Sequence, residues 1–407
     1  MTDTADSLVP PSDLEAAQVT WIRTIPDRVR DRGMFGLDPV VNILLVALLT
    51  GGHVLLEGNP GLGKTALVRA LSAALGLGET AVGRIQFTPD LMPSDITGTE
   101  MPGPNRGELV FKPGPIFCQL LLADEINRAT PKTQAAMLEA MAEYQVTVLG
   151  VRRPLRDWRQ ATPWQSPFMV MATQNPIDQE GTYPLPEAQS DRFMFKVLMS
   201  LPDADVIGQI IDKDLAPLRP PLARADQDDS HARNTAMEGL HTLSQAIRSV
   251  ALLPVVKTQI INIVQASNGN MAQVRDLSQP RRKALEELVR DRITYPLGPR
   301  AAGAMARAAV GWAAVALVEP ADAARGTSAH TPQALAQTVV PVLRHRLKVT
   351  QGYADHFSPQ AEARALDDFI RALADAAAPD LDPRARAWGY AEDFAEAQSH
   401  ARLSVPL

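Results

Sequence analysis

Hydrophobic residues in the first half of the chain fall into short, nearly continuous runs separated by stretches with helical periodicity. The runs predict strands over 53–57, 84–88, 119–125, 168–173 and 193–198. The intervening patterns predict helices over 64–75, 131–144 and 185–191, and Thr130 and Pro131 suit the start of the second. Because buried strands that alternate with helices are typical of a parallel sheet covered on both faces, we predict an α/β core.

The segments around these runs complete the first domain. A helical pattern covers 14–50 and ends at the pair Gly51-Gly52. We therefore interpret the apolar run 40–58 as a helix followed by a buried strand, and not as a membrane span. Two further stretches, 93–114 and 145–155, alternate around turn-forming residues, which predicts hairpins that project from the core.

Strand signals vanish after about Pro202, and helical patterns take their place. The predicted helices cover 203–215, 231–250, 255–268, 281–292, 299–317, 332–347 and 360–377. We therefore expect four segments, which are a disordered N-terminus over 1–13, an α/β core over 14–202, a helical domain over 203–349 and a helical C-terminal extension over 350–407.

Composition places the chain among ordinary soluble globular proteins. Of its 407 residues 45% are hydrophobic and 21% are charged, and the net charge of −6 does not favour nucleic-acid binding. Cys118 is the single cysteine, so no intrachain disulfide can form, and we interpret it as a small buried hydrophobe. The N-terminus lacks the pattern of an export signal, so we expect a cytoplasmic protein without membrane insertion. The scattered histidines do not have the spacing of a zinc site.

The stretch between the first predicted strand and the next helix fits the phosphate-loop pattern GxxxxGK[ST]. Glycines let successive backbone N–H groups point inward at phosphate oxygens, and the positive end of the helix dipole adds to the attraction. Lys64 would reach the β- and γ-phosphates, and the Thr65 hydroxyl suits Mg²⁺. The expected nucleotide-binding residues are Gly58, Asn59, Pro60, Gly61, Leu62, Gly63, Lys64, Thr65 and Ala66.

Two later strands end in residues that suit hydrolysis of a bound nucleotide. Asp124 would hold Mg²⁺ through water, and Glu125 would polarise the attacking water. A solvated acidic loop is the alternative, but four apolar residues precede the pair. Asn175 could orient that water against the γ-phosphate, whereas by itself it could equally be part of a turn before Pro176.

Several arginines could sense the transferred phosphoryl group, whose charge spreads over three oxygens. Arg192 and Arg300 are the candidates, although by spacing alone either could form a surface salt bridge. For Arg128 a local salt bridge is favoured over contact with an adjacent subunit. The basic run 344–348 ends a helix, where cations complement the dipole, and the basic start of "QPRRKALEELVRDR" is interpreted as a solvated helix face.

The run "RIQFTPDLMPSDITGTE … GELVFKPGPIFCQLLLADEINRATPKTQAAMLEAMAE … VMATQNPIDQEGTYPLPEAQSDRFMFKV" resembles the MoxR family of AAA+ ATPases. The similarity is dense over 35–200 and looser to about Leu347. It implies a P-loop AAA+ core with a five-stranded parallel sheet, helices on both faces and β-hairpin insertions, followed by an all-α helical lid. It also implies a hexameric ring that binds ATP at its subunit interfaces.

The resemblance further implies a role for each candidate. Lys64 and Thr65 match the Walker A motif, Asp124 and Glu125 match Walker B, and Asn175 matches sensor 1. Arg192 matches an arginine finger that reaches the neighbouring subunit's site, and Arg300 matches sensor 2 of the lid. The predicted hairpins match insertions that line the pore or face partners. MoxR proteins resemble chaperones that remodel protein clients, often with a von Willebrand factor A domain partner.

The chain departs from the family pattern at three places. Ser190 stands where leucine usually precedes "DRF", and Gly298 replaces the commoner serine before Pro299-Arg300. The chain beyond about Thr350 extends past the usual lid, either as further lid helices on the same subunit or as an arm that contacts a partner. Two other functions stay open at this point, which are a nucleic-acid motor and a nucleotide-switched scaffold with little turnover.

Overall fold

The computed structural model describes residues 20–59, 61–77, 81–103, 109–155, 168–175, 182–215, 230–317, 331–350, 359–383, 386 and 390–404. The N-terminus predicted to be disordered, 1–13, lies outside these residues, as does Pro60 of the predicted loop.

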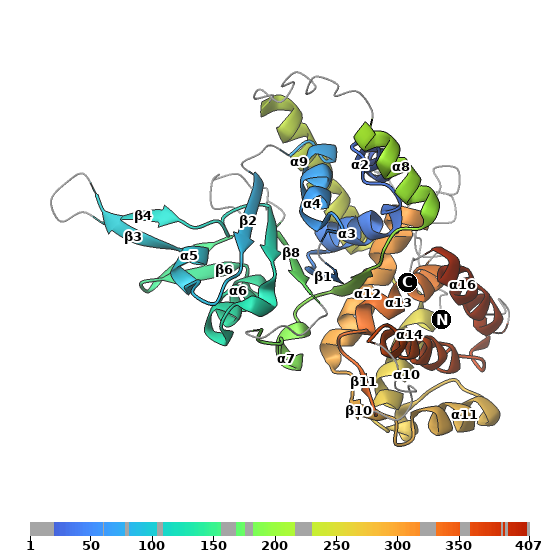
Figure 1. Ribbon diagram of the computed structural model, residues 1–407. Helices are drawn as coiled ribbons and strands as arrows, with labels where there is room; N and C mark the ends of the chain where they lie inside the picture. Colours follow the sequence, from blue (N-terminus) through green and yellow to red (C-terminus); the bar gives the residue numbers. More distant parts are fainter. Residues whose placement is uncertain are drawn as a thin grey trace, which may run out of the picture.

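A five-stranded parallel sheet forms the centre of the first domain, as the apolar runs predict (Figure 1). Its strands are β1 (Val54–Gly58), β2 (Val82–Gln86), β5 (Leu120–Asp124), β8 (Met169–Gln174) and β9 (Phe195–Met199). They lie in the order β2-β5-β8-β1-β9, and every neighbouring pair is parallel. The carboxyl ends of all five therefore meet at one edge of the sheet, where loops position functional side chains.

Helices cover both faces of this sheet. Helix α4 (Lys64–Ala74) packs with Leu122 on one face, and α6 (Pro131–Glu143) packs with Ala123 on the other. Successive residues of β5 thus enter different hydrophobic clusters, because side chains of a strand alternate between its faces. Thr130 precedes α6 and Pro131 lies in its first turn, as predicted.

The predicted helical stretch 14–50 is interrupted. The structure contains α2 (Ile25–Asp31) and α3 (Asp38–Thr50), with Gly33 and Gly36 at φ +85° and +68° between them. Left-handed backbone of this kind ends a helix. Helix α3 in turn ends at Gly51, also left-handed at φ 71°, which confirms the glycine pair as a helix stop before β1.

Two hairpins project from the core. One is formed by β3 (Gly98–Pro102) and β4 (Leu109–Pro113), and the other by β6 (Gln145–Val148) and β7 (Val151–Pro154) (Figure 1). The start of the predicted hairpin 93–114 is instead a short helix, α5 (Pro93–Thr97), because the Asp95 carboxylate accepts a hydrogen bond from the N–H of the preceding Met92. The guanidinium of Arg153 lies 3.7 Å from the ring centre of Phe111, so the two hairpins contact each other.

The second half of the chain is helical. Its helices are α8 (Ala204–Leu215), α9 (Ser230–Ser249), α10 (Pro254–Ser267), α11 (Gln279–Val289), α12 (Pro299–Trp312), α13 (Thr331–Leu343), α14 (Pro359–Ala376) and α16 (Tyr390–Ser404). The prediction that strands vanish after Pro202 was wrong in one detail, since β10 (Ile293–Tyr295) pairs with β11 (Lys348–Val349). These strands are too short to give an alternating pattern.

The lid, by which we mean helices α9–α13, packs directly on the α/β core. Ser244 of α9 donates to the backbone oxygen of Leu49, and Arg344, just after α13, donates to that of Lys196 in β9. Helices α14 and α16 pack on the lid of the same chain, where Gln259 donates to the backbone oxygen of Ala374. The contacts of these helices agree with the first alternative for the extension, whereas the four segment boundaries stay predictions.

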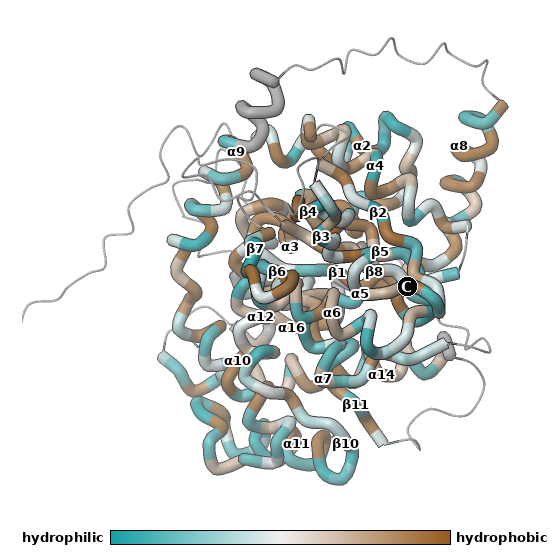
Figure 2. Tube along the Cα trace, turned by 90° about the vertical axis from the view of Figure 1, so that its left-hand side faces the viewer, coloured by the Kyte–Doolittle hydropathy of each residue, from teal (hydrophilic) through white to brown (hydrophobic). Residues whose placement is uncertain are grey.

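Helix α8 differs from its neighbours because none of its residues is buried. It lies at the edge of the molecule, and its trace carries both hydrophobic and hydrophilic stretches (Figure 2). Among the described residues, no single helix is long and apolar enough to span a membrane; one bent pair, α9 with α10, meets the length and composition test.

Candidate functional site

The phosphate loop connects β1 to α4 as the motif requires. Gly61 and Gly63 have φ values of 88° and 74°, which side chains with a Cβ rarely adopt, so these two glycines give the loop its turn. Lys64 is the first residue of α4, and its Nζ donates to the backbone oxygen of Gly58, 2.6 Å away. The lysine side chain therefore folds back over the loop that precedes its own helix.

Charges around Lys64 show which groups share its surroundings. Burial lowers the pKa of the Lys64 ammonium below its ordinary value, and the carboxylates of Asp124, Glu125 and Glu57 oppose that shift. The lysine of the loop and the acidic pair, separated by about sixty residues in the sequence, thus interact electrostatically. Phosphates bound at the loop would add negative charge and favour the protonated lysine further.

Asp124 ends β5 and is held by hydrogen bonds from two neighbouring strands. Its Oδ1 accepts from the hydroxyl of Thr173 in β8 at 2.6 Å, and its Oδ2 pairs with Arg84 of β2 at 3.1 Å. The carboxylate is a hard-oxygen donor at a strand end, which suits Mg²⁺. Arg84, whose side chain is 48% exposed, is a cation already bound to the same group.

Glu125 is fixed through both its backbone and its carboxylate. Its backbone is left-handed at φ 57°, and its N–H donates to the Thr173 hydroxyl at 2.9 Å. Its Oε2 accepts from Gln86 at 2.9 Å and pairs with Arg128 at 3.0 Å. Arg128 thus forms the local salt bridge that sequence reasoning favoured.

The end of β8 brings polar groups to the same edge of the sheet. Gln174 donates to Glu57 of β1, which also pairs with Lys196 of β9 at 3.0 Å. Asn175 follows directly after the strand and is half-buried. The structure therefore places Asn175 at the predicted strand tip, one residue beyond the strand neighbour of Glu57.

Arg192 lies in the turn between α7 (Glu187–Ser190) and β9. Its Nη1 donates to the backbone oxygen of Leu138 in α6 at 2.7 Å, and its buried Nε has no hydrogen-bond partner among the described residues. Arg300, in the first turn of α12, has a side chain that is 63% exposed and lies 3.7 Å from Asp191. The contacts recorded for the described residues thus bring the two arginines to one turn, and not to the loop or the acidic pair of their own chain.

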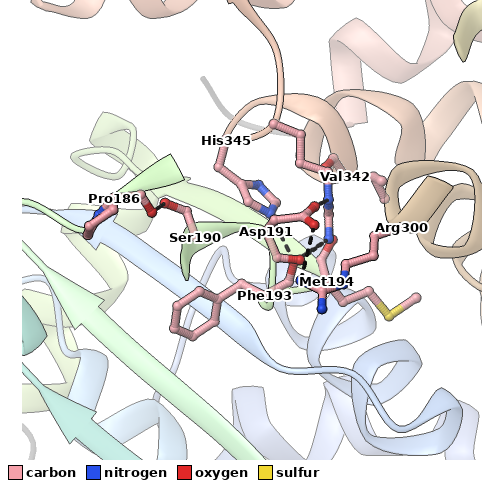
Figure 3. Close-up of polar contacts among 9 residues, drawn as sticks. Pro186, Ser190, Asp191, Phe193, Met194, Arg300, Val342 and His345 are labelled. Atoms are coloured by element: carbon pink, nitrogen blue, oxygen red, sulfur yellow. Dashed lines mark hydrogen bonds and ion pairs between the residues drawn. The ribbon is translucent and has the colours of Figure 1, made fainter. Parts of the chain in front are cut away.

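The departures from the family pattern are accommodated locally. Ser190 is buried, and its hydroxyl donates to the backbone oxygen of Pro186 at 2.9 Å (Figure 3). Gly298 precedes α12 in an extended conformation. Asp191, which follows Ser190, lies between Arg300 and Arg346, the latter just after α13.

Sequence reasoning missed three residues that hold the acidic pair and one residue that holds the turn of Arg192. Thr173 bridges Asp124 and Glu125, and Arg84 and Gln86 reach the acidic pair from the same face of β2. Arg346, interpreted as a cation that complements a helix end, is instead buried against Asp191. The one signal available in the sequence was that Arg84 and Gln86 are polar and lie two residues apart on a predicted strand, which puts them on the same face of it.

The remaining interpretations from the sequence concern residues outside the phosphate loop and the acidic pair. Cys118 is buried, and no group of three or more potential metal ligands of the His, Cys, Asp or Glu type occurs in the part of the chain that the structure describes. Helix α11 buries Leu285 and Val289. The interpretation of its basic start as a solvated face was wrong for two arginines, because Arg281 donates to the backbone oxygen of Asp375 and Arg282 donates to those of Met271 and Val274.

A parallel sheet whose first strand runs into a phosphate loop, with an acidic pair on another strand, defines a P-loop nucleoside triphosphatase. Residues 53–195 match the ATPase family associated with various cellular activities (AAA). Chaperone MoxR1 of Mycobacterium tuberculosis is 35% identical over 86% of this chain and 82% of its own length. The uncharacterized protein YeaC of Bacillus subtilis is 44% identical over 58% of this chain and 67% of its own.

A solved structure agrees with these relatives. The crystal structure of a Cytophaga hutchinsonii protein described as an ATPase superposes with a TM-score of 0.61 at 30% identity, over 87% of this chain and 96% of that one. The chain belongs to the MoxR family of AAA+ ATPases. Its activity is the hydrolysis of ATP.

Proposed function

We propose that the protein assembles into a hexameric ring that hydrolyses ATP at its subunit interfaces and uses the energy to remodel protein clients. One observation carries the proposal of a shared site. The hydrogen bonds and ion pairs recorded for Arg192 and Arg300 link them to Leu138 and Asp191, whereas the loop and acidic pair form a separate site on the same chain. Arginines whose described contacts lie outside the loop and the acidic pair of their own chain suit a neighbour's γ-phosphate.

Within one site the roles follow from the contacts. Lys64 would bind the β- and γ-phosphates, and Glu125 would polarise the attacking water from its fixed position after β5. Asn175 would orient the same water through its neutral amide. Arg192, which has an unpaired Nε among the described residues, would enter the adjacent site as an arginine finger, and Arg300 would accompany it as sensor 2.

The residues present fit a magnesium ion. The donor set is a hydroxyl from Thr65 and a carboxylate from Asp124, both hard oxygens. When bound, Mg²⁺ supplies charge neutralisation for the phosphates. Arg84 already binds the carboxylate of Asp124, which supports the view that this group is arranged for a cation.

The relatives support the wider role. One of them is named a chaperone, which favours a protein client over nucleic acid, as does the net charge of −6. By the family resemblance we also propose a von Willebrand factor A domain protein as partner, and a cytoplasmic location without membrane insertion. The paired hairpins, joined by Arg153 and Phe111, are the surfaces that we propose to face the client.

Mixing of inactive subunits tests the shared site. A Lys64→Ala subunit cannot hold ATP but keeps Arg192, whereas an Arg192→Ala subunit holds ATP but lacks the finger. Mixed rings should regain phosphate release, because the first type supplies its arginine to the second. Mixtures of Lys64→Ala with a subunit that carries both substitutions serve as control and should stay inactive. If the mixture of single variants forms hexamers yet stays inactive, the shared site is refuted.

A further inference from the structure

The segment after α13 holds a buried arginine with several backbone acceptors. The Arg346 side chain is 5% exposed, and its Nε pairs with Oδ1 of Asp191 at 2.7 Å. Its terminal nitrogens donate to the backbone oxygens of Asp191, Phe193, Met194 and Val342. A guanidinium in a buried position is tolerated when its donors are satisfied in this way.

Neighbouring side chains strengthen the same contact. His345 shares a hydrogen bond of 2.9 Å with the backbone oxygen of Phe193 through its Nε2, and Lys348 pairs with Glu187 of α7. Figure 3 shows Asp191, Phe193 and Met194 facing Val342 and His345. Residues 345–348 therefore bind the chain on both sides of Arg192, in residues 187–194.

These contacts fix the backbone of Arg192 to the lid. Both of its sequence neighbours, Asp191 and Phe193, accept hydrogen bonds from Arg346, whereas Arg192 itself contacts α6 through Leu138. The turn thus lies between a helix of the core and the end of a lid helix. A shift of the lid relative to the core would move the backbone from which the Arg192 side chain extends.

We propose that Arg346 is a positioning residue for Arg192, so that the orientation of the lid sets how the guanidinium of Arg192 is presented to the neighbouring subunit. The inference deepens the proposed function and depends on the role of Arg192 at a shared site. Asp191 connects this contact to Arg300 as well, because its second carboxylate oxygen lies 3.7 Å from Arg300. The carboxylate of Asp191, the residue before Arg192 in the chain, therefore contacts both Arg300 and Arg346.

The variant Arg346→Lys tests this role, with Arg344→Lys as matched control. Lysine keeps the charge but cannot reproduce the planar set of five donors. Arg344 lies two residues earlier and is similarly buried at 8% exposure, yet it pairs with Asp367 of α14 and donates to the backbone oxygen of Lys196 in β9, outside the turn 187–194. Thermal unfolding of both variants shows whether they fold. Asp191→Asn, which keeps the size of the side chain, is a second variant that weakens the same contact.

We expect Arg346→Lys to lower kcat about 10- to 100-fold with the KM for ATP unchanged, because a misplaced catalytic group costs turnover rather than binding. Arg344→Lys should stay within about threefold of the parent. Mixing Arg346→Lys with Lys64→Ala subunits should restore phosphate release, since the second type has a properly held Arg192. Adding Arg346→Lys to Arg192→Ala should lower kcat no further.

The outcomes separate the two proposals. If Arg192→Ala is rescued by Lys64→Ala subunits but Arg346→Lys and Asp191→Asn are not, the positioning role is overturned and the shared site stands. An equal loss of kcat in Arg344→Lys would also overturn the positioning role, because it would indicate general disruption of the lid. If Arg192→Ala itself is not rescued, the shared site fails and the inference fails with it.

Discussion

Thr173 is the residue through which the structure makes its sharpest prediction. Its side chain is fully buried, donates to Asp124 at 2.6 Å and accepts from the N–H of Glu125 at 2.9 Å. Thr173→Val keeps the shape and removes both hydrogen bonds. The N–H of Glu125 then loses its acceptor, and the left-handed backbone at φ 57° loses the contact that holds it.

The magnitude follows from these two bonds. A buried N–H without an acceptor costs about 1–3 kcal/mol, and a hydrogen bond to a charged group contributes about 1.5–3 kcal/mol. The Asp124 side chain is 15% exposed, so water can replace part of the second contribution. We therefore expect the free energy of unfolding to fall by about 2–4 kcal/mol. We also expect kcat for ATP to fall about 10- to 100-fold as Glu125 shifts.

Denaturant unfolding and steady-state phosphate release measure both effects. Thr173→Ser is the control, because it keeps the hydroxyl and loses one methyl group, at a cost of about 1 kcal/mol. The serine variant should retain most of the activity. Equal stability and equal kcat in the valine and serine variants would refute the reasoning, since the hydroxyl would then have no role.

Two further predictions rest on other contacts. Arg84→Gln removes the cation that competes for Asp124, so the Mg²⁺ concentration at half-maximal activity should fall by up to about fivefold in a magnesium titration, and an increase would contradict the competition. Burial lowers the pKa of His345 far below its ordinary value, and the positive charge of Arg346 lowers it further. The folded protein therefore keeps the imidazole neutral, whereas the unfolded chain binds a proton below about pH 6.5. The free energy of unfolding should therefore fall as the pH drops below that value, by up to about 1.4 kcal/mol per pH unit. His345→Gln should remove this part of the pH dependence, which denaturant unfolding at several pH values measures. An unchanged pH dependence would count against the assignment.

The fold was largely predictable because its signals are local. Continuous apolar runs gave the five strands of the sheet, and the glycine loop identified the site from eight consecutive residues. The break between α2 and α3 could not be predicted as easily, since Gly33 and Gly36 act through left-handed backbone that the hydrophobic pattern does not report. Helix α5 was missed for a similar reason, because a single side-chain hydrogen bond from Met92 to Asp95 starts it.

The candidate site was predictable as a set of chemical groups and not as a set of contacts. Asp124 and Glu125 follow an apolar strand, which indicates their position, but Thr173 comes from a strand 48 residues or more away along the chain. Arg346 is separated from Asp191 by 155 residues, and nothing in the basic run 344–348 distinguishes a buried ion pair from a favourable helix end. Such partners depend on how the lid packs on the core, which no local pattern records.

Glu125→Gln tests the central claim most directly, because it exchanges the proposed general base for a neutral group of the same size. The variant should bind ATP with a Kd within a few-fold of the parent, since Lys64 and the loop are unchanged, while phosphate release falls about 100-fold or more. ATP binding by equilibrium titration and phosphate release should be measured on the same preparation. Unchanged phosphate release in a variant that retains ATP would contradict the assignment of Glu125 and, with it, the account of hydrolysis at this site.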